Sequence, residues 1–505
     1  MSSSVSPADS TTPTSSAAAS ATSSAASSVT PSRTSAPTSS APAPPKASAP
    51  DPDGKPGLVL LLSAGAAFMA FLDTTIVNVA FPDLAKSFPA DGVSDLSWVV
   101  SSYAVLFAAL LTPVGRIADA FGRKRVFLVS LAGFTLASAL CAAAPNLPFL
   151  ITARAVQGAA AAGLIPAALG LLLSTTPPAK LAAAIGVWGA AGSMASATGP
   201  SLGGVLVDAF GWRSVFLINV PVGALLVVAG MRGLPERTGT QRRLPDPLGT
   251  LSVMLGIGAL VLGLTKGSDW GWGAASTVAT TAGGLGLIAV ALVRSAHQET
   301  PAIETGLFRN RTFAVASGAS AFAGAALFAW LLSSPLFLTA EWHYSVLKAG
   351  FAVTPGAFTS AIAAVVVGRR AKPRQLPAVV AVSMASFAAV SFWTWAQLGT
   401  ETRFLALWLP MGLVGGAAFG ATLTALSTAA ATSLPPQQFA SGVGMSTTAR
   451  QLGGALGVAA TASVIAAHGL GGATAFREVF LICAALALVA AVIGMSLSRT
   501  LVKES

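Results

Sequence analysis

The stretch from Ala70 to Pro82 reads AFLDTTIVNVAFP and decides how the rest of the sequence is interpreted. It closes a segment that is apolar or small-polar throughout from residue 57 to residue 80, in which Asp73 is the only charged side chain. At ~1.5 Å per residue, a helix of this length crosses a bilayer core of ~30 Å. A carboxylate at such depth is costly, and ionisable groups inside membranes commonly serve ion or substrate pathways. Asp73 is therefore a functional candidate before any motif is considered.

The composition is that of a polytopic membrane protein. Of the 505 residues, 53% are hydrophobic and 9% are charged, and the mean hydropathy is +0.73, which excludes a soluble globular domain. The formal charge of +11 is spread in short basic clusters between apolar segments, a pattern typical of membrane orientation and not of nucleic-acid binding. Cys141 and Cys483 fall inside apolar runs, which predicts small buried hydrophobes and neither a metal site nor a disulfide.

The chain divides into a polar start and a series of apolar segments. Residues 1–55 are rich in Ser, Thr, Ala and Pro, and we expect a disordered cytoplasmic tail. Fourteen apolar segments follow, and each is predicted to be a membrane helix: 57–81, 97–114, 126–144, 149–173, 181–206, 213–232, 247–265, 274–293, 312–338, 347–367, 377–397, 404–429, 441–467 and 476–497.

Lysine and arginine fall mainly in alternate loops, which predicts the orientation. Cytoplasmic loops carry an excess of these residues, so the rich loops are assigned to the inside and both termini are expected in the cytoplasm. The assigned residues are Arg116, Arg123, Lys124, Arg125, Arg232, Arg237, Arg242, Arg243, Arg294, Arg309, Arg311, Arg369, Arg370, Lys372, Arg374, Arg499 and Lys503.

The loop after the second segment reads GRIADAFGRKRVF from Gly115 to Phe127. By itself it is equally consistent with a basic turn that fixes topology. The spacing of Gly115, Asp119, Gly122 and Arg123, however, resembles the G-x-x-x-D-x-x-G-R-[KR] loop of the major facilitator superfamily. Asp119, near a helix end, is predicted to contact a guanidinium or the N-terminus of a neighbouring helix and so to latch one conformation.

Arg154 is the only charge in the fourth segment. With Gln157 and Gly158 it resembles the R-x-x-Q-G motif of the same superfamily. Asp73 lies nine residues before Pro82 and Arg154 six residues after Pro148, so both are expected ~9–13 Å from the same membrane face. The two side chains are predicted to meet. A proton-coupling pair and a purely structural ion pair are both consistent with this placement.

The fifth segment contains GVWGAAGSMASATGPSLGG. Its glycines and proline resemble the motif of antiporters in the superfamily, with one departure, since Ala195 stands where that motif has glycine. The resemblance implies a hinge or seal formed by Gly186, Gly199, Pro200 and Gly203.

The opening stretch itself is similar to the L-D-x-T-I-V-N-V-A-[LF]-P signature of the fourteen-helix drug:proton antiporter branch of this superfamily. The resemblance implies an all-α membrane fold of two six-helix bundles with two inserted helices. Its predicted parts are an N-terminal bundle at 56–232, inserted helices at 233–311, a C-terminal bundle at 312–498 and a cytoplasmic tail at 499–505.

We therefore expect a transporter that exports amphipathic organic compounds or drugs in exchange for protons, with Asp73 and Arg154 as the coupling pair. Its partners would be the small organic cargo, protons and the lipid bilayer of the plasma (inner) membrane, with no cofactor or metal beyond the proton gradient. Candidate residues of the substrate cavity are Asn78, Trp98, Tyr103, Gln157 and Trp188.

Several alternatives remain at this stage. With Asp73 apparently alone in the membrane interior, apolar or weakly cationic cargo is the simplest expectation. A proton-linked transporter of one metabolite, or a non-transporting sensor or scaffold, is also compatible with the sequence. An enzyme is not supported, because the three histidines, His297, His343 and His468, form no ligand or nucleophile constellation.

Overall fold

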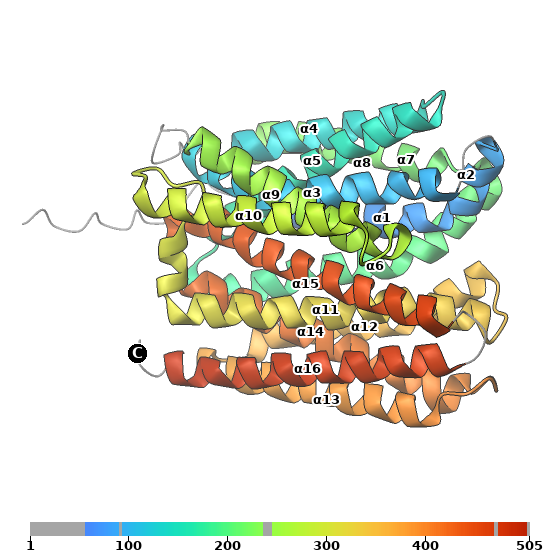
Figure 1. Cartoon of the computed structure of the whole chain (residues 1–505). Helices are drawn as coiled ribbons and strands as arrows, with labels where there is room; N and C mark the ends of the chain where they lie inside the picture. The colour runs from blue at the N-terminus through green and yellow to red at the C-terminus, as the bar shows by residue number, and fades with distance from the viewer. Residues whose placement is uncertain (1–55, 90–92, 236–244, 469–472, 502–505) are drawn as a thin grey trace, which may run out of the picture. The chain divides into compact units, whose positions relative to one another are not determined.

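The computed structural model describes residues 56–89, 93–235, 245–468 and 473–501. The predicted tail at 1–55 and most of the one at 499–505 lie outside these ranges. The described residues form α-helices joined by short turns, without strands, as predicted (Figure 1).

The long helices lie side by side (Figure 1). In chain order the α-helices are α1 (Pro56–Val79), α2 (Phe81–Ser87), α3 (Val93–Phe121), α4 (Arg123–Ala142), α5 (Leu147–Thr175), α6 (Leu181–Phe210), α7 (Ser214–Leu217), α8 (Asn219–Gly233), α9 (Pro247–Trp270), α10 (Ala275–His297), α11 (Arg311–Ala340), α12 (Val346–Arg370), α13 (Leu376–Gln397), α14 (Leu409–Thr432), α15 (Phe439–His468) and α16 (Ala473–Leu501).

All fourteen predicted segments are helical. Among the described residues, twelve helical spans are long and apolar enough to cross a membrane, and the bent helix α6 makes a thirteenth. The remaining predicted segment, 441–467, forms α15, which is 30 residues long and is not among these spans. It packs against α3 and α5 on one side and α11 on the other, so most of its surface faces protein. A helix shielded in this way does not need the hydropathy that lipid contact requires.

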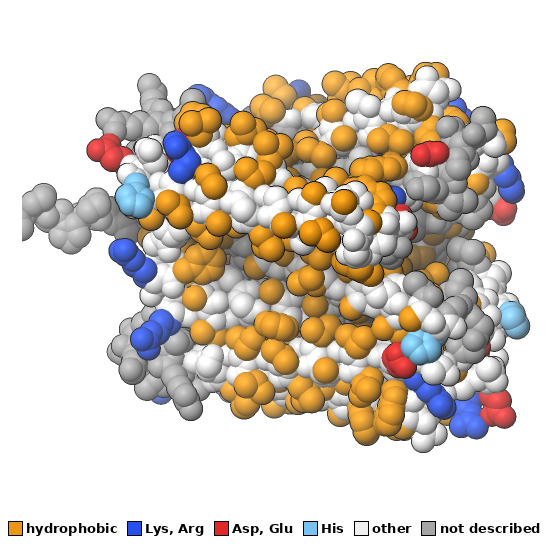
Figure 2. All heavy atoms as spheres, in the orientation of Figure 1, with side chains coloured by type: hydrophobic (Ala, Val, Ile, Leu, Met, Phe, Trp, Pro, Cys, Tyr) orange, Lys and Arg blue, Asp and Glu red, His pale blue; other side chains and the backbone are white. Residues whose placement is uncertain are grey.

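Apolar side chains cover the flank of the molecule between its two ends. Figure 2 shows hydrophobic side chains along the helices and charged ones gathered at the ends of the bundle. Large hydrophobic residues on the flank are well exposed, among them Leu61 at 66%, Val129 at 73% and Val382 at 66%. Such a surface is expected of a chain whose outer face contacts lipid. The division into two bundles at the predicted boundaries stays a prediction.

Local sequence explains where several helices begin. The side chains of Asn146 and Asn310 accept hydrogen bonds from the backbone amides of Phe149 and Phe313, and so cap α5 and α11. Asp246 caps α9 through the amide of Gly249.

Helices α9 and α10, the pair predicted to be inserted, are tied together at their Asp246 end. Arg294 of α10 donates two hydrogen bonds of 2.9 Å to the Asp246 carboxylate. These bonds hold the pKa of Asp246 below its ordinary value.

A break between α7 and α8 interrupts the sixth predicted segment at Ile218. It precedes Pro221, which has no amide hydrogen and whose ring crowds the carbonyl of Leu217. The break leaves Asn219, at the start of α8, buried in the bundle.

Candidate functional site

The side chains predicted to lie at matching depth form an ion pair. Nη1 of Arg154 lies 2.5 Å from Oδ2 of Asp73, and the two side chains are 1% and 0% exposed. Nε2 of Gln157 donates to Oδ1 of Asp73 at 2.9 Å, and Nδ2 of Asn219 donates to the same atom at 3.2 Å. Helices α1, α5 and α8 thus supply a carboxylate and three donors in one enclosed network.

Ser138 of α4 completes this network. Its hydroxyl oxygen lies 3.0 Å from both Nε2 of Gln157 and Nδ2 of Asn219, and the hydroxyl donates to the backbone carbonyl of Phe216 at 3.2 Å. Both amides are therefore fixed in orientation, with their NH₂ groups toward Asp73.

Arg154 is held on several sides. Its Nε donates to the carbonyl of Val99 at 3.1 Å, and Nη1 also donates to Oε1 of Gln157 at 2.7 Å. Its guanidinium lies 4.3 Å from the ring centroid of Tyr103 and 5.6 Å from that of Phe216. A proton on Asp73 would remove the one carboxylate that bonds this cation within the described chain, so the charge state of the carboxylate governs whether the network stays together.

The predicted latch connects α3 to the N-terminus of α15. The carboxylate of Asp119 accepts hydrogen bonds from the amides of Ala440 at 3.2 Å and Ser441 at 2.6 Å, and from the hydroxyl of Ser441 at 2.6 Å. Arg123 donates to the same carboxylate at 2.7 and 2.8 Å. Asp119 therefore makes both kinds of contact predicted for it, one with a guanidinium and one with a helix N-terminus.

Two glycines make the latch sterically feasible. Gly122 joins α3 to α4 with φ of 109°, a conformation that residues with a Cβ rarely adopt. A Cβ at Gly115 would lie 2.7 Å from the carbonyl oxygen of Ala440, so glycine is needed where α3 and α15 meet.

Helix α6 carries the predicted hinge and is bent. The bend is 40° between its segments ending at Ser196 and starting at Thr198, just before Pro200, whose ring crowds the carbonyl of Ser196. Gly199 and Gly203 pack on α1, where an added Cβ would lie 2.0 Å from Oγ1 of Thr75 and 2.8 Å from Cγ1 of Ile76, respectively.

The other end of α6 packs on α12. A Cβ at Gly186 would lie 2.5 Å from the carbonyl oxygen of Ala364. Ala195, the departure from the motif, is fully buried. Helix α12 also reaches the Pro200 end, where a Cβ at Gly350 would lie 3.1 Å from Cβ of Pro200, so α6 contacts both the helix of Asp73 and a helix of the second half.

Comparisons with known proteins show the family. The family model described as the Major Facilitator Superfamily matches residues 63–458. The chain belongs to the major facilitator superfamily. It is accordingly a multi-pass membrane transporter and not an enzyme.

Relatives of this superfamily member include exporters and resistance proteins. It is 34% identical over 421 residues to the multidrug resistance protein Stp of Mycobacterium tuberculosis, with 81% of this chain and 76% of the relative covered. It is 35% identical over 432 residues to the puromycin resistance protein pur8 of Streptomyces alboniger, with 82% and 84% covered. It is 30% identical over 401 residues to the multidrug export protein EmrB of Escherichia coli, with 79% and 78% covered.

A solved structure has the same fold. The human organic anion transporter MFSD10 (TETRAN) aligns with a TM-score of 0.64 over 87% of this chain and 99% of its own. At 17% identity this likeness shows the fold alone.

The candidate cavity residues of this transporter lie in three different places. Tyr103 and Gln157 are buried in the Asp73 network. Trp188 is also buried and packs edge-on against Phe71, 6.2 Å between ring centroids. The five residues therefore do not line one cavity in this conformation.

Asn78 and Trp98 lie farther along α1 and α3, near Lys266 of α9. A hollow of about 290 Å³ is lined by Asn78 and Lys266 among others. The ammonium of Lys266 lies 5.1 Å from the ring centroid of Trp98 and donates to Ser97 and Asp269.

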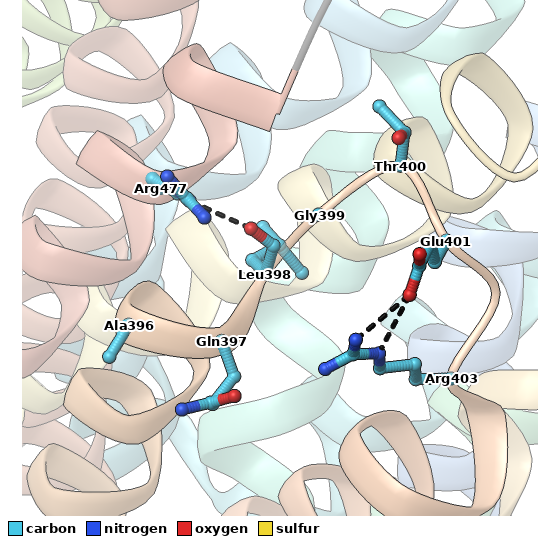
Figure 3. A pocket seen from close by; sticks show the side chains of 8 residues that line it. All are labelled: Ala396, Gln397, Leu398, Gly399, Thr400, Glu401, Arg403 and Arg477. Atoms are coloured by element: carbon cyan, nitrogen blue, oxygen red, sulfur yellow. Dashed lines mark hydrogen bonds and ion pairs between the residues drawn. The ribbon is translucent and has the colours of Figure 1, made fainter.

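A second hollow, of about 380 Å³, lies at the turn between α13 and α14 (Figure 3). Arg477 donates to the carbonyl of Leu398 at 2.7 Å, and Arg403 pairs with Glu401 at 2.8 Å, as the dashed lines show. The hollow shares no residue with the Asp73 network, and the charges on its wall are already engaged, so we assign it no role in transport.

Sequence reasoning assigned no role to Ser138 and Asn219. The sequence did contain an indication for Asn219, because its side-chain amide is the only polar side chain in the apolar run from Phe216 to Pro221. Serine occurs in many of the membrane segments, and nothing in the sequence distinguishes Ser138.

Replacing Asn219 by alanine removes one of the three donors to Asp73. Because the ion pair with Arg154 remains, we expect transport to continue at a rate reduced about three- to tenfold, the effect of one lost hydrogen bond to a charged group. Initial rates of dye transport into inverted vesicles test this. A wild-type rate in folded Asn219→Ala would contradict a contribution of Asn219 to the Asp73 network.

Replacing Gly199 by alanine places a methyl group against Thr75. We expect overpacking of ~1–3 kcal/mol and transport reduced about tenfold, with partial recovery when Thr75 is also replaced by alanine. Gly318→Ala is the matched control, because no atom lies within 4 Å of a Cβ there. If the double variant is no better than Gly199→Ala, the contact with Thr75 is not the cause.

Proposed function

We propose that this protein is a proton-coupled exporter of small amphipathic organic compounds, located in the plasma (inner) membrane with both termini in the cytoplasm. The observation that carries the proposal is the sealed network in which Asp73, inside a membrane helix, bonds to Arg154. The resistance and export functions in the names of the relatives support the direction of transport and the kind of cargo.

In the proposed cycle the proton acts on the charge of Asp73, and no chemistry is done on the cargo. Protonation leaves Arg154 with neutral partners only, the carbonyl of Val99 and the amide of Gln157. An uncompensated cation in the interior is unfavourable, which shifts the equilibrium toward a conformation that separates the pair.

The rearrangement is proposed to spread through α1 to the rest of the bundle. Helix α1 packs on Gly199 and Gly203 of the bent α6, and α6 packs on α12. At the arginine-rich end, assigned to the cytoplasm, Asp119 joins α3 to α15. With the latch engaged and Asp73 enclosed, the structure is assigned to a state closed toward the cytoplasm.

Inverted membrane vesicles test the proposal. With an acid interior, the wild type is expected to accumulate a fluorescent amphipathic dye, and an uncoupler should abolish accumulation because the proton gradient is the sole energy source. Vesicles without the protein provide the background. Accumulation that persists at the same rate with the uncoupler would show that transport is not proton-coupled.

A further inference from the structure

Arg450 is a cation in the middle of α15 to which the proposed function gives no role. It lies eleven residues after the start of the helix at Phe439, or ~17 Å along its axis. Helix α15 packs against α3 and α5 of the first half and α11 of the second. The side chain of Arg450 is half-buried. It therefore lies in the interior, near where the two halves of the chain meet.

The guanidinium of Arg450 has no bonded partner among the described residues. No hydrogen bond or ion pair joins it to any of them, in contrast to Arg154. Its nitrogen atoms are not among the fully enclosed polar atoms that lack a partner. They therefore keep some accessible surface, which a ligand atom could contact.

Helices α11 to α15 of the second half offer Arg450 no counter-ion. The sequence has no Asp or Glu between Glu304 and Glu341, between Glu341 and Glu401, or between Glu401 and Glu478. Helices α11 to α15 therefore contain no acid. In the first half, the carboxylate of Asp73 is already occupied by its own donors. A buried cation without a carboxylate is unfavourable unless an anion joins it.

The surroundings of Arg450 would suit the rest of an amphipathic molecule. Its stem passes Gly324 of α11, where an added Cβ would lie 2.8 Å from Cγ of Arg450. One turn farther along α11, the half-buried ring of Phe328 packs beside Gly454. Arg450 and Phe328 thus lie on adjacent turns of the α11–α15 contact, one contributing a charged group and the other an apolar ring.

We infer that Arg450 binds an acidic group of the cargo, and that this transporter carries amphipathic organic anions such as carboxylates. The inference rests on the proposed function and narrows its substrate class. It also replaces the sequence-based expectation of apolar or weakly cationic cargo. That expectation was based on the scarcity of acidic residues in the membrane segments and did not take the positive charge of Arg450 into account. A fixed positive charge attracts an anion and repels a cation.

Equilibrium binding to the purified full-length protein in detergent tests the inference. The probes are dansylglycine, which carries a carboxylate, and dansylglycinamide, which carries a neutral amide in its place and is otherwise identical. We expect the wild type to bind the carboxylate at least about tenfold more tightly than the amide, the size of one charge-assisted hydrogen bond. Arg450→Gln should remove this preference without changing amide binding, and Arg450→Lys should keep much of it.

Arg374→Gln is the matched control, because it removes the same charge from an exposed position; its binding should equal that of the wild type. Thermal unfolding without ligand should show Arg450→Gln to be at least as stable as the wild type. The substitution removes a half-buried charge that has no counter-ion, and such a charge destabilises the folded state. A destabilised variant that loses both probes equally would make Arg450 structural and overturn the inference. An unchanged carboxylate preference in Arg450→Gln would also overturn it.

Two further measurements distinguish an organic from an inorganic anion, and binding from proton coupling. If chloride stabilises the wild type but not Arg450→Gln against unfolding, and the wild type does not prefer dansylglycine, the site takes an inorganic ion and the inference is wrong. The assay uses no gradient, so it is independent of the coupling scheme. Asp73→Asn should keep the carboxylate preference even though gradient-driven transport is lost.

Discussion

Replacing Asp73 by asparagine should lower gradient-driven dye accumulation in inverted vesicles at least about 100-fold, equivalent to ~2.7 kcal/mol. Asparagine has nearly the same shape and its oxygen can still accept a bond from Arg154, but it cannot bind and release a proton. The variant should therefore lose the response to the gradient. Accumulation at imposed pH differences of zero to two units is the measurement.

Asp208→Asn is the matched control for this substitution. Asp208 is an exposed acid on α6, and its replacement should leave accumulation unchanged. Size-exclusion chromatography of both variants checks that each is folded. If folded Asp73→Asn accumulates dye with the wild-type dependence on the gradient, Asp73 is not the coupling acid.

The second large effect is expected from replacing Asp119 by asparagine. The charged carboxylate accepts bonds from Arg123 and from the first turn of α15, and a neutral amide would hold both groups more weakly. We expect transport to fall at least about tenfold, because the closed state loses its charge-assisted contacts. The amides of Ala440 and Ser441 should exchange with solvent deuterium at least about tenfold faster, since both donate to Asp119.

Lys124→Gln is the control for the latch, because it removes a charge from the same loop without changing the bonds of Asp119. Its transport rate and the exchange of α15 should match the wild type. If deuterium exchange at Ala440 and Ser441 is unaltered in Asp119→Asn, the Asp119 carboxylate does not stabilise the N-terminus of α15 in the membrane-embedded protein.

Much of the site could be predicted from the sequence, because the depth of a residue in the membrane is proportional to its distance in residues from the end of its helix. Asp73 and Arg154 are each the only charge in an apolar segment, and counting residues from the prolines at the segment ends placed them at one level. The place of Asp119 near a helix end likewise indicated a contact with a guanidinium or with the N-terminus of a neighbouring helix. Each of these inferences needs only the rise of a helix and the high energy of an isolated charge in a membrane.

Other residues could be placed only by the tertiary structure. Tyr103 and Gln157 were candidates for a substrate cavity, yet both face the Asp73 network, because rotation of a helix about its axis is not visible in its hydropathy. Asn219 reaches that network through the break before Pro221. Helix α15 packs against α3, α5 and α11, and these contacts are not visible in its own sequence.

The sequence alone determined that the chain is a polytopic membrane protein, which segments are helical, and that Asp73 and Arg154 lie close enough along their helices to meet. These properties depend on composition and on distance along single helices. The tertiary structure decided which side chains share a contact: it enclosed Asp73 among Arg154, Gln157 and Asn219, and it left Arg450 without a bonded partner in the described part of the chain. Partners depend on the packing and rotation of helices far apart in the chain, which local hydropathy does not specify.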